Sequence, residues 1–260
     1  MNNRIIALLT DFGTQDGYVG AIKGKILSDV PDAKVVDISH NIEPFNIKQA
    51  AFCLNNSYAF FPEKTIFVAV VDPGVGTRRK GLLIKTAHHY FIGPDNGVFS
   101  FIYSREACRV FRIVEEALPW EISHTFHGRD VFSPIACLIS NSSNIDNYIE
   151  PVTDHLSFIH PFKKVDDQHY ILSVLHIDRF GNVIFNFHQK DHNVLGKKSE
   201  LTIVYEGRKI GGVFKTFGEV KDNELLITWD STGYLQLAKN MGNAARALNI
   251  RTGDEVELIL

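Results

Sequence analysis

The chain has 260 residues, of which 45% are hydrophobic and 22% charged, and its formal net charge is −3 at pH 7. This length can hold one large α/β domain or two smaller ones around a substantial core. The small negative charge and the scattered basic residues give no indication of nucleic-acid or anionic-membrane binding. No apolar stretch approaches the ~18 residues of a membrane span. No signal-peptide pattern precedes the first predicted strand, so we expect a cytoplasmic protein.

The three cysteines support the same expectation. Cys53, Cys108 and Cys137 have no metal-type spacing, and an odd number of cysteines does not indicate a disulfide framework. Each has apolar neighbours, which favours buried thiols in a reducing compartment.

The first part of the chain alternates strand and helix patterns. Apolar runs predict strands at residues 5–9, 33–38, 65–71, 82–85, 90–92 and 110–114. Apolar residues at three- and four-residue spacing predict helices at residues 18–30, 47–60 and 129–139. This order is typical of a mixed, largely parallel sheet with helices on its faces.

The polar segment 161–168 interrupts this periodicity and predicts a boundary between two domains. We expect an N-terminal α/β domain over residues 1–160 and a C-terminal domain over residues 168–260. In the second domain, strands separated by Gly and Asn are predicted at residues 170–177, 183–187, 200–205, 225–227 and 255–260. One long helix is predicted over 235–248. This pattern favours a small β-barrel or sandwich.

The predicted strand 65–71 leads into a loop with a carboxylate at its start and two guanidiniums at its end. Ligands of open α/β sheets bind at the carboxyl ends of the strands, where this loop lies. Asp72 and Arg79 are far enough apart for the loop to double back and pair them. The alternative is an ordinary turn with solvated arginines.

Other polar residues follow predicted strands or precede a predicted helix, and each has a structural alternative. Asp11 follows the first strand and could cap the next helix. His127 precedes a helix and could be a cap or a core residue. Asp178 and Asn182, between two strands, could be turn residues.

Six motifs occur in order along the chain. They are Leu-Thr-Asp-Phe-Gly from residue 9, Val-Asp-Pro-Gly-Val-Gly-Thr from residue 71, Gly-Pro-Asp-Asn-Gly from residue 93, Thr-Phe-His-Gly-Arg-Asp from residue 125, Asp-Arg-Phe-Gly-Asn from residue 178 and Asp-Ser-Thr-Gly-Tyr-Leu from residue 230. This set resembles the S-adenosylmethionine (SAM) hydroxide adenosyltransferases, also called SAM hydrolases, which are related to fluorinase and chlorinase. The resemblance runs from residue 5 to about residue 248.

The resemblance implies an enzyme in which hydroxide attacks the ribose 5′ carbon of SAM and releases adenosine and L-methionine. The family's catalytic trio falls on Asp72, Arg79 and His127. Arg79 cannot be the base because a guanidinium stays protonated in proteins, but it can stabilise hydroxide while Asp72 orients it. His127 suits the role of proton acceptor or relay. No metal or other cofactor is expected, because the sulfonium is already an activated leaving group and SAM is the substrate.

The resemblance also implies residues that bind the adenosine part of SAM. Asp11 matches a carboxylate that holds both ribose hydroxyls, and Asn182 matches an amide that contacts the adenine edge. Phe180 matches a ring lying against the adenine, and Phe217 matches a second one in a looser alignment. Phe45 stands where fluorinase has tryptophan.

The methionine contacts and the nucleophile site separate the branches of the family. Asp178 matches a group near the methionine ammonium, and Ser231 a contact to its carboxylate, although Thr232 stands where fluorinase has arginine. Gly128 replaces the halide-binding serine of fluorinase, and Asp72 replaces a tyrosine. A carboxylate beside the nucleophile would repel halide, so the sequence favours hydroxide.

In this family a helix-flanked mixed sheet domain is followed by a small β-barrel, and the resemblance implies a homotrimer with active sites at subunit interfaces. Two alternatives stay open. One is a non-catalytic SAM or adenosine sensor. The other is a metal-dependent hydrolase, whose ligands would be Asp11, Asp72, Asp95, His127 and Asp130. The two arginines in the loop argue against a metal there.

Overall fold

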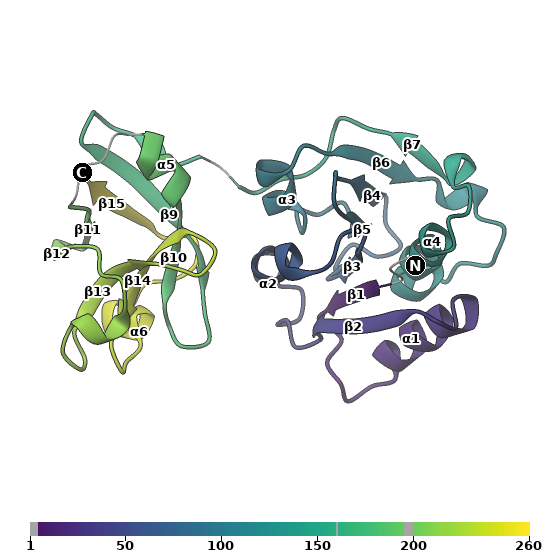
Figure 1. Cartoon of the computed structure of the whole chain (residues 1–260), viewed down its shortest axis with the longest axis horizontal. Helices are drawn as coiled ribbons and strands as arrows, with labels where there is room; N and C mark the ends of the chain where they lie inside the picture. Colours follow the sequence, from purple (N-terminus) through teal and green to yellow (C-terminus); the bar gives the residue numbers. More distant parts are fainter. Residues whose placement is uncertain (1–4, 160, 195–199) are drawn as a thin grey trace. The chain divides into compact units, whose positions relative to one another are not determined.

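The computed structural model describes residues 5–159, 161–194 and 200–260. It divides into two compact units, Met1–Phe158 and Ile159–Leu260, which are drawn in Figure 1. Each unit has its own buried hydrophobic residues. Among the described residues, no helix is both long enough and apolar enough to cross a membrane.

The first unit is built on a seven-stranded sheet in the order β2-β1-β3-β5-β4-β6-β7. The strands are β1 (Ile5–Thr10), β2 (Lys34–Ser39), β3 (Ile66–Val70), β4 (Gly81–Lys85), β5 (Tyr90–Pro94), β6 (Arg109–Ile113) and β7 (Ile149–Pro151). Strand β1 pairs in parallel with β2 and β3, and β3 with β5, whereas the pairs from β5 to β7 are antiparallel. The predicted mixed sheet is therefore confirmed.

Helices cover both faces of this sheet (Figure 1). They are α1 (Tyr18–Asp29), α2 (Ile47–Ser57), α3 (Ser100–Arg105) and α4 (Ser133–Ser140), with single turns at Tyr58–Phe60, Glu115–Ala117, Gly128–Phe132 and Asp146–Tyr148. Successive residues of a strand point to opposite faces. Ile6 and Leu8 of β1 accordingly pack in one cluster with α1 and α4, and Ala7 and Leu9 pack in the other with α2 and α3.

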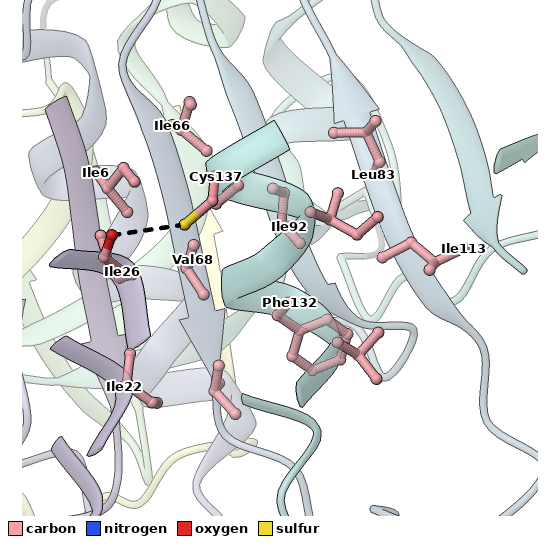
Figure 2. Close-up of a cluster of buried hydrophobic side chains, with 14 of the residues drawn as sticks. Ile6, Ile22, Ile26, Ile66, Val68, Leu83, Ile92, Ile113, Phe132 and Cys137 are labelled. Atoms are coloured by element: carbon pink, nitrogen blue, oxygen red, sulfur yellow. Dashed lines mark hydrogen bonds between the residues drawn. The ribbon is translucent and has the colours of Figure 1, made fainter. Parts of the chain in front are cut away.

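Figure 2 shows the cluster under α1 and α4. Cys137 of α4 lies against Ile26 of α1, with its Sγ 4.0 Å from the Ile26 carbonyl oxygen. Burial raises the pKa of the Cys137 thiol to about 12. This cysteine is therefore a core residue, and its thiol is inert at neutral pH.

The second unit is an antiparallel sheet in the order β12-β11-β15-β9-β10-β14-β13, with β8 beside β9. Its strands are β8 (Lys163–Lys164), β9 (His169–Ile177), β10 (Val183–His188), β11 (Thr202–Tyr205), β12 (Arg208–Gly211), β13 (Leu225–Trp229), β14 (Tyr234–Lys239) and β15 (Glu255–Ile259). Its helices are α5 (Gln189–Val194) and α6 (Ala244–Leu248), with a short turn at Phe217–Glu219. A bridge between Val213 and Ile227 brings the two ends of the sheet together, so the sheet is nearly closed. The predicted barrel-like second domain is confirmed.

The long helix predicted over 235–248 is wrong. Residues 234–239 form β14, a strand paired with β10 on one side and β13 on the other. Only Ala244–Leu248 is helical, after a turn in which Met241 has a positive φ of 51°. The apolar spacing that suggested a helix arises because β14 is buried along nearly its whole length, which hides the two-residue alternation of a strand.

Candidate active site

Two acidic residues leave the first sheet side by side. Strands β1 and β3 are parallel neighbours, and Thr10 is paired with Val70 at their carboxyl ends. Asp11 directly follows β1, and Asp72 lies two residues beyond β3. Both carboxylates therefore lie at the carboxyl edge of the sheet, the edge at which ligands of open α/β sheets bind.

The loop from Asp72 to Arg79 folds back on itself through short internal hydrogen bonds. The Thr77 N–H and hydroxyl both donate to the Gly74 carbonyl, at 3.1 and 2.7 Å. Gly76 has a φ of 74°, and a Cβ at this position would lie 2.4 Å from the His124 carbonyl oxygen. Only glycine combines this left-handed backbone with such a close approach.

Arg79 is bound on one side by Asp72. Its Nε lies 3.0 and 3.1 Å from the two carboxylate oxygens, and its Nη2 donates to Asp72 Oδ2 at 2.6 Å. The two side chains are only 9% and 5% exposed. A charge-assisted pair with this geometry, largely removed from water, is strong and holds the guanidinium in one orientation.

His127 contacts the other side of the guanidinium. Its Nδ1 lies 2.7 Å from Arg79 Nη2, and its side chain is 5% exposed. It precedes the π-helical turn Gly128–Phe132 without capping it through its side chain. The three residues that the sequence selected as a catalytic trio are thus in direct contact.

Glu115 completes this group, although the sequence analysis did not select it. Its Oε1 lies 3.4 Å from Arg79 Nη1 and 3.5 Å from His127 Nδ1. Burial raises the pKa of Glu115, but the hydrogen bond and charge of His127 and the guanidinium of Arg79 lower it more, so its pKa lies below the usual glutamate range. No sequence motif marks this residue, because it reaches Arg79 only through the pairing of β4 with β6.

A pocket of about 410 Å³ lies in front of these residues. It is lined by Asp11, Phe12, Tyr18, Pro44, Phe45, Val70, Asp72, Val75, Thr125, Phe126, His127 and Gly128. Its volume falls within the range of small-molecule sites. Arg79 does not line it but lies directly behind Asp72 and His127.

Asp11 and Phe45 meet at the mouth of this pocket. The Phe45 N–H donates to Asp11 Oδ2 at 2.8 Å, and Phe45 has a φ of 68° and a ring that is 69% exposed. A positive φ is strained for a bulky residue, and such strain is concentrated at functional sites. The alternative in which Asp11 caps the next helix is wrong, because Gly17 is the N-cap of α1 and no side chain caps it.

Three aromatic rings that the sequence analysis did not select form one wall of the pocket. Phe12, Tyr18 and Phe126 contact one another with ring centroids 5.4 to 5.9 Å apart. Phe12 and Phe126 are the immediate neighbours of Asp11 and His127, so the quoted motifs contain them. Tyr18 is the first residue of α1, and helical periodicity alone gives it no special role.

In the second unit, one turn carries three of the predicted binding residues. Asp178 accepts hydrogen bonds from the backbone N–H groups of Phe180 and Asn182, both at 2.9 Å, and from the Asn182 side-chain amide at 2.8 Å. Asp178 and Asn182 are therefore residues of one turn, and their hydrogen bonds to each other fix its shape. This turn also presents the Phe180 ring to the outside, where it is 75% exposed.

The two other predicted residues of this unit lie on separate turns. Phe217 begins the short helix Phe217–Glu219 and is 44% exposed. Ser231 is exposed in a turn between β13 and β14, where Asp230 accepts hydrogen bonds from the N–H groups of Thr232 and Tyr234.

The five ligands considered for a metal site do not converge. Asp95 Oδ1 accepts the N–H of Leu156, whereas Asp130 binds Arg129 and the N–H of Ser123. Across the described ranges, no group of three or more His, Cys, Asp or Glu side chains is arranged to hold a metal ion.

Comparisons with known proteins identify the same family along both units. Residues 6–148 match the family model described as SAM hydroxide adenosyltransferase N-terminal domain, and residues 172–257 match its C-terminal domain. A protein of Methanocaldococcus jannaschii named (R)-S-adenosyl-L-methionine hydrolase is 38% identical over 98% of this chain and 95% of its own length. A fluorinase of Nocardia brasiliensis is 25% identical over 98% of this chain and 96% of its own. A crystal structure of a conserved protein from Thermotoga maritima superposes with a TM-score of 0.86 at 32% identity, covering 98% of this chain and 100% of that chain.

Proposed function

Because this chain belongs to the SAM hydroxide adenosyltransferase family, we propose that it hydrolyses SAM to adenosine and L-methionine. The observation that carries the proposal is the buried contact of Asp72, Arg79 and His127 behind a pocket of ligand size. Gly128, at the position of the fluorinase serine, offers no side-chain donor for halide. Asp72 places a carboxylate where an incoming halide would be repelled.

The name of the curated relative indicates which form of the substrate to test. Its L refers to the amino acid, so its (R) refers to the sulfonium centre. We propose the (R) sulfonium epimer of SAM as the preferred substrate of this chain as well. The two epimers differ only in the arrangement around sulfur, so a pocket that fits one excludes the other by shape.

The reaction needs a stronger nucleophile than neutral water, because water attacks a saturated carbon slowly. In the proposed mechanism His127 accepts a proton from a water molecule, and the positive charge of Arg79 stabilises the hydroxide that forms. Asp72 holds Arg79 in place. The hydroxide then attacks the 5′ carbon in line with the sulfonium, which leaves as the neutral thioether of methionine.

The decisive experiment is incubation of the purified protein with both sulfonium epimers of SAM in oxygen-18 water containing a chelator. We expect labelled adenosine, unlabelled methionine and preferential loss of the (R) epimer by mass spectrometry and chiral chromatography. Intact SAM with saturable binding would support the sensor instead. Activity that disappears only when chelator is added would support a metal-dependent hydrolase.

Asp11 is proposed to bind both ribose hydroxyls through its two carboxylate oxygens. These contacts exist in the ground state and in the transition state alike. Asp11→Ala is therefore expected to raise the Kd for SAM about 10- to 100-fold, at roughly 1.5–3 kcal/mol for a charged hydrogen bond, with a smaller change in kcat. Isothermal titration measures the Kd for SAM, and single-turnover kinetics measures the rate of the chemical step. An unchanged Kd with a lower kcat would contradict the ribose role.

We further propose a homotrimer in which the pocket of one subunit is completed by Asp178, Phe180 and Asn182 of a neighbour. The support is the family resemblance, together with two exposed aromatic side chains, Phe45 and Phe180, on the two units. The cytoplasmic location stays a prediction.

Mixing two impaired variants, assayed at a SAM concentration well below the Kd of either, tests this assembly. Asp11→Ala damages only the first unit and Asn182→Ala only the second. If each site combines two subunits of a ring, one site in three is intact in every mixed trimer, so doubly tagged trimers are expected to recover about a third of the wild-type activity. The experiment co-expresses the two variants with different tags, isolates doubly tagged oligomers and measures their mass by light scattering. Mixed oligomers no more active than the separate variants would place the whole site within one chain.

A further inference from the structure

The Nδ1 atom of His127 lies between a hydrogen-bond donor and an acceptor. Arg79 Nη2 is 2.7 Å away and Glu115 Oε1 is 3.5 Å away. A guanidinium has only donors, so a neutral His127 that accepts from Arg79 carries its own proton on Nε2. In that tautomer Nε2 cannot take a proton from water, and His127 cannot act as a base through this atom.

The other neutral tautomer carries its proton on Nδ1 and needs an acceptor there. Arg79 cannot accept, and its 2.7 Å contact favours the proton on Nε2, whereas the Glu115 carboxylate at 3.5 Å can accept and favours the proton on Nδ1. The two neighbours compete for Nδ1, and the proton lies there when the ring turns from the guanidinium toward Glu115. We propose that Glu115 is a positioning residue that holds the proton of His127 on Nδ1 and thereby leaves Nε2 free to accept a proton from the attacking water. This inference rests on the proposed hydrolysis of SAM. Glu115 itself touches neither the pocket nor the reacting atoms.

The charges of the group favour this assignment. Asp72 and Glu115 carry two negative charges against the single positive charge of Arg79, so the group is one charge negative while His127 is neutral. A proton taken up by His127 brings it to zero. Because these side chains are largely removed from water, the charges interact strongly. Asp130, three residues after His127, is neutralised locally by Arg129 at 2.6 Å.

The pairing of β4 with β6 places Glu115 next to Arg79. Strands β4 and β6 are antiparallel, with Gly81 paired with Ile113. Two residues beyond this pair in each direction are Arg79 and Glu115, which therefore face each other. The lowered pKa of Glu115 keeps it ionised at neutral pH.

The proton and electron balance of the step is complete. One water proton moves to Nε2 of His127, and the ring becomes an imidazolium whose Nδ1–H donates to Glu115. The hydroxide oxygen forms a bond to the ribose 5′ carbon while the bond from that carbon to sulfur breaks, and its electron pair stays on the neutral thioether. The imidazolium then releases its proton to solvent. This arrangement follows the logic by which an acidic residue orients a histidine base in other hydrolases.

The test compares Glu115→Gln with Glu116→Gln, a matched control at the exposed neighbouring glutamate. Glutamine keeps the size of the side chain but removes its charge. Glu115→Gln is expected to lower kcat at least about tenfold, a part of what a general base contributes, with an unchanged KM. Glu115→Asp is expected to recover part of the loss. The acid limb of the pH–rate profile is expected to move to lower pH, because the imidazolium has lost its anion.

A second readout does not depend on activity. In nitrogen-15 spectra of the imidazole, the pH at which the His127 ring becomes protonated is expected to fall by at least about half a unit in Glu115→Gln. Glu116→Gln is expected to behave as wild type. If kcat, the acid limb and this titration are the same in Glu115→Gln and Glu116→Gln, the inference is overturned. If wild-type protein releases no adenosine, the proposed function fails instead, and the titration still decides whether Glu115 governs the proton on His127.

Discussion

Replacing Arg79 with glutamine is expected to lower kcat for SAM hydrolysis about 10²- to 10³-fold, the usual cost of removing a group that stabilises a developing oxyanion. Glutamine cannot supply the positive charge on which hydroxide formation depends. It also cannot hold Asp72 and His127 together as the guanidinium does at 2.6 and 2.7 Å. Because Arg79 does not line the pocket, SAM binding is expected to change little. Single-turnover kinetics with a separate binding titration measures both quantities.

Loss of Arg79 also leaves Asp72 as an unpaired buried carboxylate, which can cost about 3–5 kcal/mol of folding stability. The double variant Asp72→Asn with Arg79→Gln removes both charges and separates the two effects. It is expected to regain thermal stability but not activity. Arg78→Gln is the matched control, because Arg78 is exposed and lies next in the chain. Full kcat in a folded Arg79→Gln protein would exclude the guanidinium from hydroxide formation.

Replacing His127 with alanine is expected to lower kcat/KM about 10²- to 10⁴-fold at neutral pH, the range contributed by a general base. Without the imidazole the reaction depends on hydroxide already present in solution. The concentration of this hydroxide rises tenfold for each pH unit, so the variant is expected to gain activity steadily with pH. The wild type is expected to level off once His127 is neutral. A pH–rate profile of both proteins measures the difference.

His124→Ala is the matched control for this experiment, since His124 is exposed and lies three residues earlier. It is expected to keep the wild-type profile, because alanine keeps the backbone carbonyl and the Cβ of this residue, which are the groups near Gly76. A low, flat profile in His127→Ala would mean that the ring maintains the arrangement of Arg79 without moving a proton. Thermal denaturation of both variants distinguishes a local effect from unfolding.

The placement of the two acidic residues at one edge of the first sheet could be predicted because it depends on local patterns. The predicted runs 5–9 and 65–71 are almost continuously apolar and correspond to β1 (Ile5–Thr10) and β3 (Ile66–Val70), and parallel strands deliver the residues that follow them to the same edge. Asp11 and Asp72 therefore lie at the same edge of the sheet, where both line the pocket. The order of the motifs identified the family, and matches to the family models in both units confirmed this identification.

In the second unit, predicting the element from its apolar pattern failed for residues 235–248, because the strand there is buried on both sides. Leu235 and Leu237 lie in the core, but the alternate residues Tyr234, Gln236 and Ala238 are also buried, because β14 is an interior strand of a nearly closed sheet. Five buried residues in succession fit a helix as well as a strand. Strand pairing, which the sequence does not display, decided between them.

By itself, the sequence determined the family, the alternation of strands and helices in the first unit, and the three residues that meet around the guanidinium of Arg79. Those features follow from local periodicity and from sequence motifs, and neither depends on the register of strand pairing. Only the tertiary structure showed Glu115 opposite Arg79, because their contact follows from the register of β4 against β6 over a separation of 36 residues. Register depends on which side chains are buried together, and the free energy of that burial belongs to the folded chain as a whole.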